Sequence, residues 1–198
     1  MKFPLLIGLT GGIGSGKSSV AKILEAEGFP VYYSDIEAKN IVNKKEIKTK
    51  IIALLGENAY DNLGKYNTKW IAEKVFQDEN LLSQLNAIIH PAVKQDFEDW
   101  LKKQNSPLVF KETALLFELG LEKKCYKSIL ITAEENIRIK RVMNRDGKTY
   151  REVKAIIDRQ MPEKEKISRA DFVIENNQEL DNLQEKVKQV LKEIKIIQ

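Results

Sequence analysis

The chain has 198 residues, of which 42% are hydrophobic, and its 33 basic and 29 acidic side chains leave a net charge of +4. This length can bury the core of one domain, and so mild an excess of positive charge does not indicate a nucleic-acid-binding protein. The lone Cys125 excludes a disulfide framework and a cysteine-based metal site. Because there is no signal peptide and no long apolar stretch, we expect a cytoplasmic protein without a membrane anchor.

The first predicted elements surround a glycine-rich segment. The apolar run Leu5–Thr10 is typical of a buried strand, and Ser19–Ala26 has the spacing of a helix. Between them, residues 11–18 read GGIGSGKS and fit the phosphate-binding pattern G-x-x-x-x-G-K-[ST]. Glycines let main-chain N–H groups turn toward an anion, and the helix that follows presents its positive end to the same anion. The segment therefore predicts a nucleotide-phosphate site, called the phosphate loop below.

The last two residues of the phosphate loop have separate expected roles. Lys17 is expected to reach the β- and γ-phosphates of ATP, and the hydroxyl of Ser18 is expected to bind Mg²⁺. The residues expected to hold the nucleotide are Gly12, Ile13, Gly14, Ser15, Gly16, Lys17, Ser18 and Ser19.

An acidic residue follows the second predicted strand. Gly28 and Pro30 are expected to end the first helix, and the β-prone run at 31–33 leads to Asp35. The carboxyl ends of parallel strands line the ligand crevice of such folds. There, the carboxylate can accept the proton of an acceptor hydroxyl or order Mg²⁺ through water. The alternative is that Asp35 caps the helix predicted over 36–42.

Residues from about 45 to 104 carry helical patterns with no strand between them. Apolar stripes predict helices over 47–55 and from Thr68, and Pro91 predicts the start of a further helix. We interpret this region as a helical insertion that binds the acceptor substrate. His90 lies between an isoleucine and a proline, and on this pattern alone a structural role is favoured.

Two short patterns raise the alternative of a GTP-dependent switch protein. Asn43–Glu46 partly matches N-K-x-D, and Asp61–Gly64 spells D-x-x-G. The first ends in the wrong residue, the second follows no strand, and their order is reversed. We interpret both as surface turns. A kinase is favoured, although another P-loop small-molecule kinase, such as one acting on nucleoside monophosphates, remains open.

The C-terminal part resumes an alternation of strands and helices. The expected elements are strands over 107–112, 128–132 and 171–174, and helices over 134–145, 150–160 and 180–197. This alternation predicts an α/β protein with a parallel sheet covered on both faces. Together with the phosphate loop, it indicates a three-layer P-loop NTPase or kinase fold, with one domain spanning residues 1–198.

Arginines recur in the region after residue 137. Arg138, Arg141 and Arg145 lie three and four residues apart, so they share one face of the predicted helix. Phosphoryl transfer spreads negative charge over the moving group, which guanidinium groups can stabilise. We therefore expect a lid over about 141–160.

The chain resembles the dephospho-CoA kinase family over nearly its whole length. The segments that carry the resemblance are Ile7–Ser18, Asp35, Ile89-His90-Pro91, Leu115-Leu116-Phe117-Glu118, Arg141, Arg145-Asp146, Arg159-Gln160, and 170–177 with Asn176. The resemblance implies transfer of the γ-phosphate of ATP, with Mg²⁺, to the ribose 3′-hydroxyl of dephospho-CoA, which is the last step of coenzyme A synthesis.

The resemblance also implies roles for single residues. Asp35 is expected to be the base, while Lys17 and Arg141 stabilise the moving charge. Asn176 is expected to lie near adenine. The acceptor-binding residues that it implies are Asp35, His90, Leu116 and Glu118.

Overall fold

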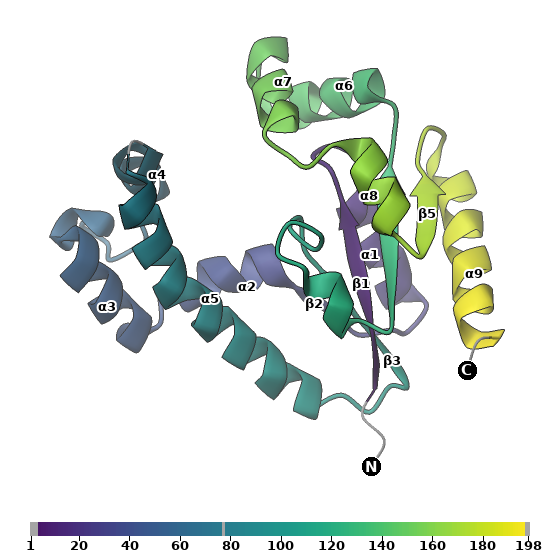
Figure 1. Cartoon of the computed structure of the whole chain (residues 1–198), viewed down its shortest axis with the longest axis horizontal. Helices are drawn as coiled ribbons and strands as arrows, with labels where there is room; N and C mark the ends of the chain where they lie inside the picture. Colours follow the sequence, from purple (N-terminus) through teal and green to yellow (C-terminus); the bar gives the residue numbers. More distant parts are fainter. Residues whose placement is uncertain (1–3, 77, 197–198) are drawn as a thin grey trace. The chain divides into compact units, whose positions relative to one another are not determined.

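The computed structural model describes residues 4–76 and 78–196 (Figure 1). The chain forms two compact units. The first, called the sheet unit here, contains the chain up to Tyr32 and again from Gln104 onward. The second, called the helical unit, is Tyr33–Lys103.

A five-stranded sheet, counted within the described residues, organises the sheet unit. Its strands are β1 (Leu5–Gly11), β2 (Val31–Tyr33, which leads into the helical unit), β3 (Leu108–Glu112), β4 (Lys127–Thr132) and β5 (Phe172–Glu175). The strand order is β2-β3-β1-β4-β5. Strand β1 pairs in parallel with β3 and β4, and β4 pairs in parallel with β5. The strand that enters the phosphate loop is therefore central.

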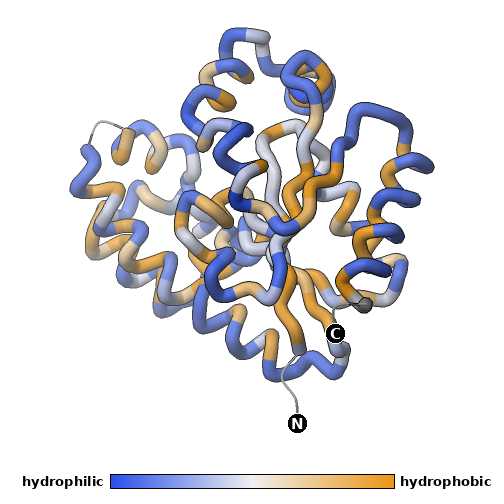
Figure 2. The backbone as a smooth tube through the Cα atoms, turned by 45° about the vertical axis from the view of Figure 1, so that its right-hand side comes forward, coloured by the Kyte–Doolittle hydropathy of each residue, from blue (hydrophilic) through white to orange (hydrophobic). Residues whose placement is uncertain are grey.

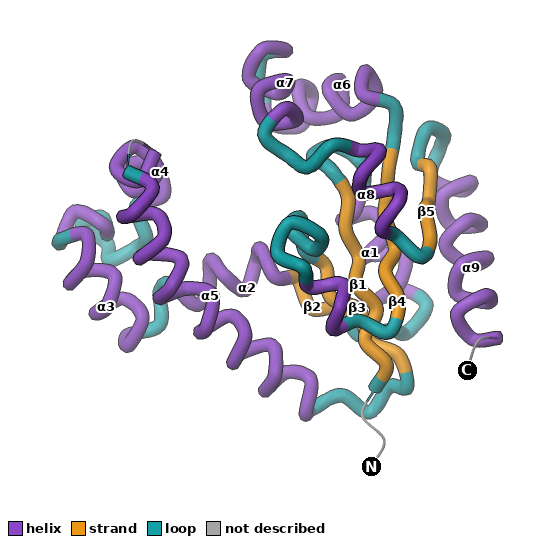
Figure 3. The backbone as a smooth tube through the Cα atoms, viewed as in Figure 1, coloured by secondary structure: helices purple, strands orange, loops and turns teal. Residues whose placement is uncertain are grey.

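The central stretches of β1, β3 and β4 are mostly apolar because both faces of the sheet are covered. Ile7, Leu9 and Phe110 are fully buried, and Figure 2 shows the strands mostly in orange while the helices alternate between blue and orange. Helix α1 (Lys17–Ala26) packs against α9 (Leu180–Ile196), and α8 (Glu163–Arg169) packs against β4. Figure 3 shows α1 behind the strands and α8 in front of them. The predicted three-layer α/β fold is confirmed.

The first helix ends where the sequence predicts. Gly28 has a left-handed φ of 86° and donates a hydrogen bond to the carbonyl of Glu25 at 2.9 Å. Phe29 donates to the carbonyl of Leu24 at 3.0 Å. This pair of bonds satisfies the last carbonyls of the helix, and glycine is the residue that adopts the required φ most easily.

The helical unit is built from helices packed around their own apolar cluster. Its helices are α2 (Ser34–Ile41), α3 (Lys45–Leu55), the short 3₁₀ helix η1 (Glu57–Ala59), α4 (Thr68–Phe76) and α5 (Glu79–Lys102). The buried residues of its cluster include Ile41, Ile51, Ile71 and Leu85. The compact unit begins at Tyr33, whereas the predicted insertion begins near residue 45, because α2 packs against α5.

The predicted helix start at Pro91 is wrong, because Pro91 lies inside α5. Proline removes one helical N–H, and its ring is tolerated only where packing compensates for the loss. Ile89 before it and Val93 after it both pack against the cluster of the helical unit. Burial of this shared apolar face favours one continuous helix.

The two patterns that suggested a switch protein form local turns or surface contacts. The carboxylate of Asp61 accepts hydrogen bonds from the main-chain N–H groups of Leu63 at 2.9 Å and Lys65 at 2.8 Å. Lys44 pairs with Asp96 at 2.7 Å. The predicted surface turn at 61–64 is therefore confirmed.

The C-terminal helices include one that the sequence did not predict. Helices α6 (Glu135–Asp146) and α7 (Tyr150–Asp158) occur as expected, and Thr149 caps α7 with a capping box. Helix α8 was missed because its sequence, EKEKISR, has little apolar periodicity. The predicted last helix matches α9, although its expected end at residue 197 lies outside the described residues. No described helix combines the length and the apolar character that a membrane crossing needs.

Candidate functional site

The phosphate loop forms a tight turn between the central strand and the first helix. Strand β1 ends at Gly11, and α1 begins at Lys17. Gly14 and Gly16 have left-handed φ angles of 77° and 101°, and Ser15 donates a main-chain hydrogen bond to the carbonyl of Gly12 at 3.1 Å. The turn leads into the start of α1, where the main-chain N–H groups of a first helical turn and the helix dipole favour an anion.

Three glycines of the loop lie in close contact with residues that are distant in the sequence. A Cβ on Gly16 would lie 2.1 Å from Nδ2 of Asn176, and one on Gly14 would lie 2.5 Å from the carbonyl oxygen of Arg138. A Cβ on Gly12 would lie 2.2 Å from Nη2 of Arg138. Arg138 and Asn176, which are distant in the sequence, therefore lie in direct contact with the backbone of the phosphate loop.

The polar residues at the start of α1 differ in their exposure and contacts. Lys17 is half-buried, and its Nζ donates to the carbonyl of Gly11 at 2.8 Å. Ser18 is exposed in the first turn. Within residues 4–76 and 78–196, no group of three His, Cys, Asp or Glu side chains could hold a metal ion. One hydroxyl fits Mg²⁺ that is bound mainly by phosphate and water oxygens.

The three arginines predicted on one helix face have different surroundings. Arg138 is only 4% exposed, and its Nε donates to the carbonyl of Ile13 at 2.9 Å. Arg141 is half-buried and donates from Nη1 to the carbonyl of Asn176 at 3.0 Å. Arg145 is exposed and pairs with the adjacent aspartate. The structure therefore brings two of the three arginines to the phosphate loop or its neighbour, Asn176.

Asn176 joins the end of the sheet to the phosphate loop. It is 7% exposed, its main-chain N–H donates to the carbonyl of Thr132 at 2.8 Å, and its side chain donates to the carbonyl of Ser15 at 2.8 Å. The amide thus holds the loop backbone, a role that the sequence did not indicate. A contact of Asn176 with adenine stays a prediction.

The segment after β3 contributes buried residues. Leu116 is fully buried in a cluster with Phe117 and Leu130, against which Cys125 also packs. Burial raises the pKa of the Cys125 thiol to about 11, as expected of a cysteine that acts as a small apolar residue. Leu116 packs the core, and its contact with an acceptor stays a prediction.

Glu118 lies beside a lysine that sequence reasoning missed. Its carboxylate is 3.5 Å from Nζ of Lys166, whose side chain is 1% exposed. Lysine is almost never fully buried without an opposite charge nearby. No pattern around Lys166 signals this, because α8 itself has no clear periodicity.

The helical unit holds the remaining predicted residues. Asp35 and His90 are both exposed, Asp35 on α2 and His90 on α5. The alternative role of Asp35 as a helix cap is wrong, because Tyr33 occupies the N-cap position and no side chain caps α2. Asp35 lies instead in the first turn of α2.

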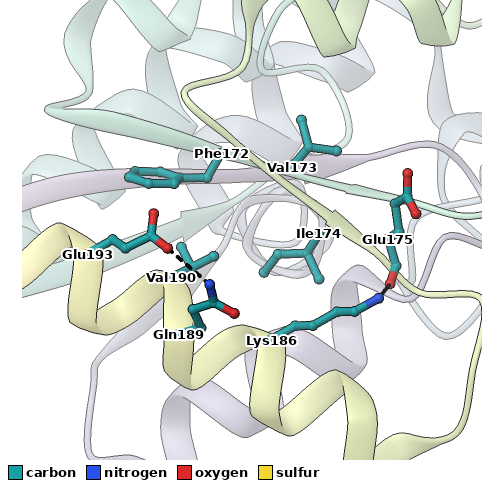
Figure 4. Close-up of a pocket in the computed structure, with 8 residues that line it drawn as sticks. All are labelled: Phe172, Val173, Ile174, Glu175, Lys186, Gln189, Val190 and Glu193. Atoms are coloured by element: carbon teal, nitrogen blue, oxygen red, sulfur yellow. Dashed lines mark hydrogen bonds between the residues drawn. The ribbon is translucent and has the colours of Figure 1, made fainter.

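A groove on the outer edge of the sheet lies apart from these residues. It has a volume of about 360 Å³ between β5 and α9, and none of the predicted site residues lines it. Figure 4 shows Ile174 and Val190 on its floor and Lys186 bonded to the main chain of Glu175. The groove therefore contains none of the residues predicted to hold the nucleotide.

The fold and the loop together define the class of protein. A parallel sheet whose central strand leads through a glycine turn into a helix, with a lysine and a serine starting that helix, is the arrangement of a P-loop phosphotransferase. The family model described as dephospho-CoA kinase matches residues 5–182. The chain belongs to the dephospho-CoA kinase family.

Relatives and solved structures agree with this assignment. The dephospho-CoA kinase of Fusobacterium nucleatum is 38% identical over 183 residues, which cover 92% of this chain and 95% of that protein. The crystal structure of TT1252 from Thermus thermophilus has a TM-score of 0.87 at 38% identity, over 97% of this chain and 98% of that one. The dephospho-CoA kinase from Campylobacter jejuni has a TM-score of 0.70 at 27% identity, over 96% of both chains.

Proposed function

We propose that this protein transfers the γ-phosphate of ATP to the ribose 3′-hydroxyl of dephospho-CoA, which yields coenzyme A and ADP. The observation that carries the proposal is a complete phosphate loop at the end of β1 in a chain that matches the dephospho-CoA kinase family over residues 5–182. Kinases of this architecture act mainly by positioning and by electrostatic stabilisation.

On the donor side, the phosphate loop would hold ATP. The N–H groups at the start of α1 would face the phosphates, and Lys17 would exchange its bond to the Gly11 carbonyl for phosphate oxygens. Arg141 would stabilise the charge that develops on the transferred group. Ser18 would supply one oxygen to Mg²⁺, whose charge offsets that of the phosphates when it is bound.

On the acceptor side, Asp35 would be the general base. Its carboxylate would take the proton of the 3′-hydroxyl as the oxygen forms a bond to the γ-phosphorus. The bond from that phosphorus to the oxygen bridging the β- and γ-phosphates would break, and ADP would leave. We propose His90 and Glu118 as further acceptor-binding residues, with the helical unit as the substrate-binding insertion and residues 141–160 as the lid.

The test is an acceptor panel with the purified full-length protein. With ATP and Mg²⁺, dephospho-CoA should give stoichiometric ADP and a product whose mass is that of coenzyme A. A nucleoside monophosphate and shikimate serve as the competing acceptors. Turnover of either of these, with none of dephospho-CoA, would replace the proposal with another small-molecule kinase. GTP hydrolysis without any acceptor would favour a switch protein.

A further inference from the structure

One residue of the phosphate loop, Ile13, is held on three sides by the C-terminal part of the sheet unit. Its N–H donates to Oε1 of Gln160 at 3.0 Å, and its carbonyl accepts from Nε of Arg138 at 2.9 Å. Its side chain packs against the apolar cluster that includes Ile139 and Val153, from α6 and α7. Both peptide groups of this residue are therefore fixed by side chains more than a hundred positions away.

The Arg138 guanidinium is itself held in place. Its Nη1 donates to Oε2 of Glu163 at 3.0 Å, in an ion pair whose arginine side chain is 5% exposed. The guanidinium lies so close to Gly12 that any Cβ there would clash with it. A buried arginine with two oriented bonds is a rigid fork, since its planar donors lose little freedom on binding.

Helix α8 anchors Glu163 through a series of charges three residues apart. Glu163 faces Arg138 on α6, Lys166 faces Glu118, and Arg169 pairs with Glu122. Each successive charge thus meets an opposite charge outside α8. Because Lys166 is buried, rotation of α8 would leave a charge without its partner in a medium of low polarity, which is costly.

We propose that Arg138, Gln160 and Glu163, together called the loop clasp, are positioning residues of the ATP site. None of them needs to touch the nucleotide. They set the orientation of the two peptide groups of Ile13, and hence the direction of the N–H groups that face the phosphates. This proposal rests on the proposed function only in taking ATP as the ligand of the loop.

The geometry gives the loop clasp a measurable signature. Without the loop clasp, the phosphate loop would have to become ordered when ATP binds. The free-energy cost of this ordering would lower the affinity for ATP. Ile13, Arg138 and Gln160 are not among the residues proposed to bind the acceptor, so the affinity for the acceptor should not change. The three clasp residues line a hollow of about 260 Å³, so shorter or isosteric side chains fit there without overpacking.

The experiment compares Gln160→Met and Arg138→Met with two control variants. Lys140→Met removes an exposed cation from α6, and Gln189→Met makes the same change on α9. Binding of ATP is measured by calorimetry without acceptor, and the KM values for ATP and dephospho-CoA are measured separately. Amide exchange of Ile13 reports directly on the peptide that Gln160 holds.

The loop clasp predicts an ATP dissociation constant raised about 5- to 50-fold in both clasp variants, the range expected for losing one or two such bonds. Exchange of the Ile13 amide should accelerate in Gln160→Met, and the KM for dephospho-CoA should stay within about two-fold. Glu163→Gln, which keeps an acceptor for Arg138, should give a smaller loss. Both control variants should have the same ATP dissociation constant and the same KM values as the original chain.

Three outcomes would overturn the proposal. The first is unchanged ATP affinity in both clasp variants, and the second is unchanged exchange of the Ile13 amide in Gln160→Met. The third is a parallel loss of ATP and acceptor affinity, which indicates general loosening. If Arg138→Met does not fold, Gln160→Met decides alone. A protein that binds ATP but ignores dephospho-CoA would refute the proposed function and leave this test intact.

Discussion

The side-chain amide of Asn176 donates a hydrogen bond to the carbonyl of Ser15 at 2.8 Å, across 161 positions of sequence. The bond joins the end of β5 to the middle of the phosphate loop. It can form only because Gly16, the next residue, leaves space that a methyl group would fill. This hydrogen bond therefore links the conformation of the phosphate loop to the position of the residue that follows β5.

Gly16→Ala should destabilise the protein and abolish ATP binding. The residue has a φ of 101°, which costs an alanine about 1–2 kcal/mol, and its Cβ would lie 2.1 Å from the Asn176 amide. Gly28→Ala is the matched control, because φ is 86° there and no atom lies within 4 Å of its Cβ. Urea unfolding and ATP calorimetry measure both effects. Equal behaviour of the two variants would mean that the contact with Asn176 is unimportant.

Lys17→Ala should remove most of the activity while the fold persists. Loss of a positioned cation at the transferred phosphate reduces turnover by about 10²–10³-fold. Lys22→Ala changes an exposed lysine of the same helix and should leave turnover unchanged. Coupled ADP release, with circular dichroism as the check of folding, makes the comparison. Activity of Lys17→Ala within a few-fold of the original would argue against the assigned role.

Asp35→Asn tests the proposed base. Turnover should fall by on the order of 10²–10⁴-fold, because the amide cannot accept the hydroxyl proton. Binding of ATP should persist. Glu37→Gln neutralises another acid in the first turn of α2. This variant therefore controls for the loss of the interaction between a carboxylate and the helix dipole. Near-normal turnover of Asp35→Asn would leave the carboxylate with a role in helix stability only.

Asp171 should make the stability of the sheet unit depend on pH. Its carboxylate accepts hydrogen bonds from Ser128 N and Oγ, both at 2.8 Å, and pairs with Lys127 at 2.9 Å. Burial alone raises the pKa of this carboxyl, but the bonds from Lys127 and Ser128 outweigh burial and hold the pKa below its ordinary value of 3.8. At low pH the folded state thus binds fewer protons than the unfolded state. The stabilisation by the Asp171 carboxylate is therefore complete above the ordinary pKa of 3.8 and is lost as the pH falls through the pKa of the folded state.

The corresponding measurement is urea unfolding of Asp171→Asn at pH 7 and at successively lower pH. At neutral pH, the free energy of unfolding of Asp171→Asn should be lower than that of the original chain by about 1–2 kcal/mol. This difference between the two proteins should shrink below about pH 4. Glu185→Gln, at an exposed position on α9, should show no such trend. A difference that stays constant down to pH 2 would exclude the carboxylate as its cause.

Local patterns were sufficient for much of this fold. The short apolar runs of β1 and β4 are typical of strands in a sheet covered on both faces, and the capping box at Thr149 is encoded within four residues. Pro91 shows the limit of such patterns, because the packing of distant residues outweighed its local effect. Helix α8 shows the same limit, since its charges become interpretable only beside Glu118, Glu122 and Arg138.

By itself, the sequence determined the α/β class, the phosphate loop and the kinase family, because each depends on residues adjacent in the chain or on a motif of fixed spacing. Only the tertiary structure decided what surrounds the loop. Arg138 and Arg141 look equivalent on one helix face, yet the fold directs one to Ile13 and the other to Asn176. Residues so far apart in the chain come into contact only after the sheet has formed. No local sequence pattern encodes these contacts.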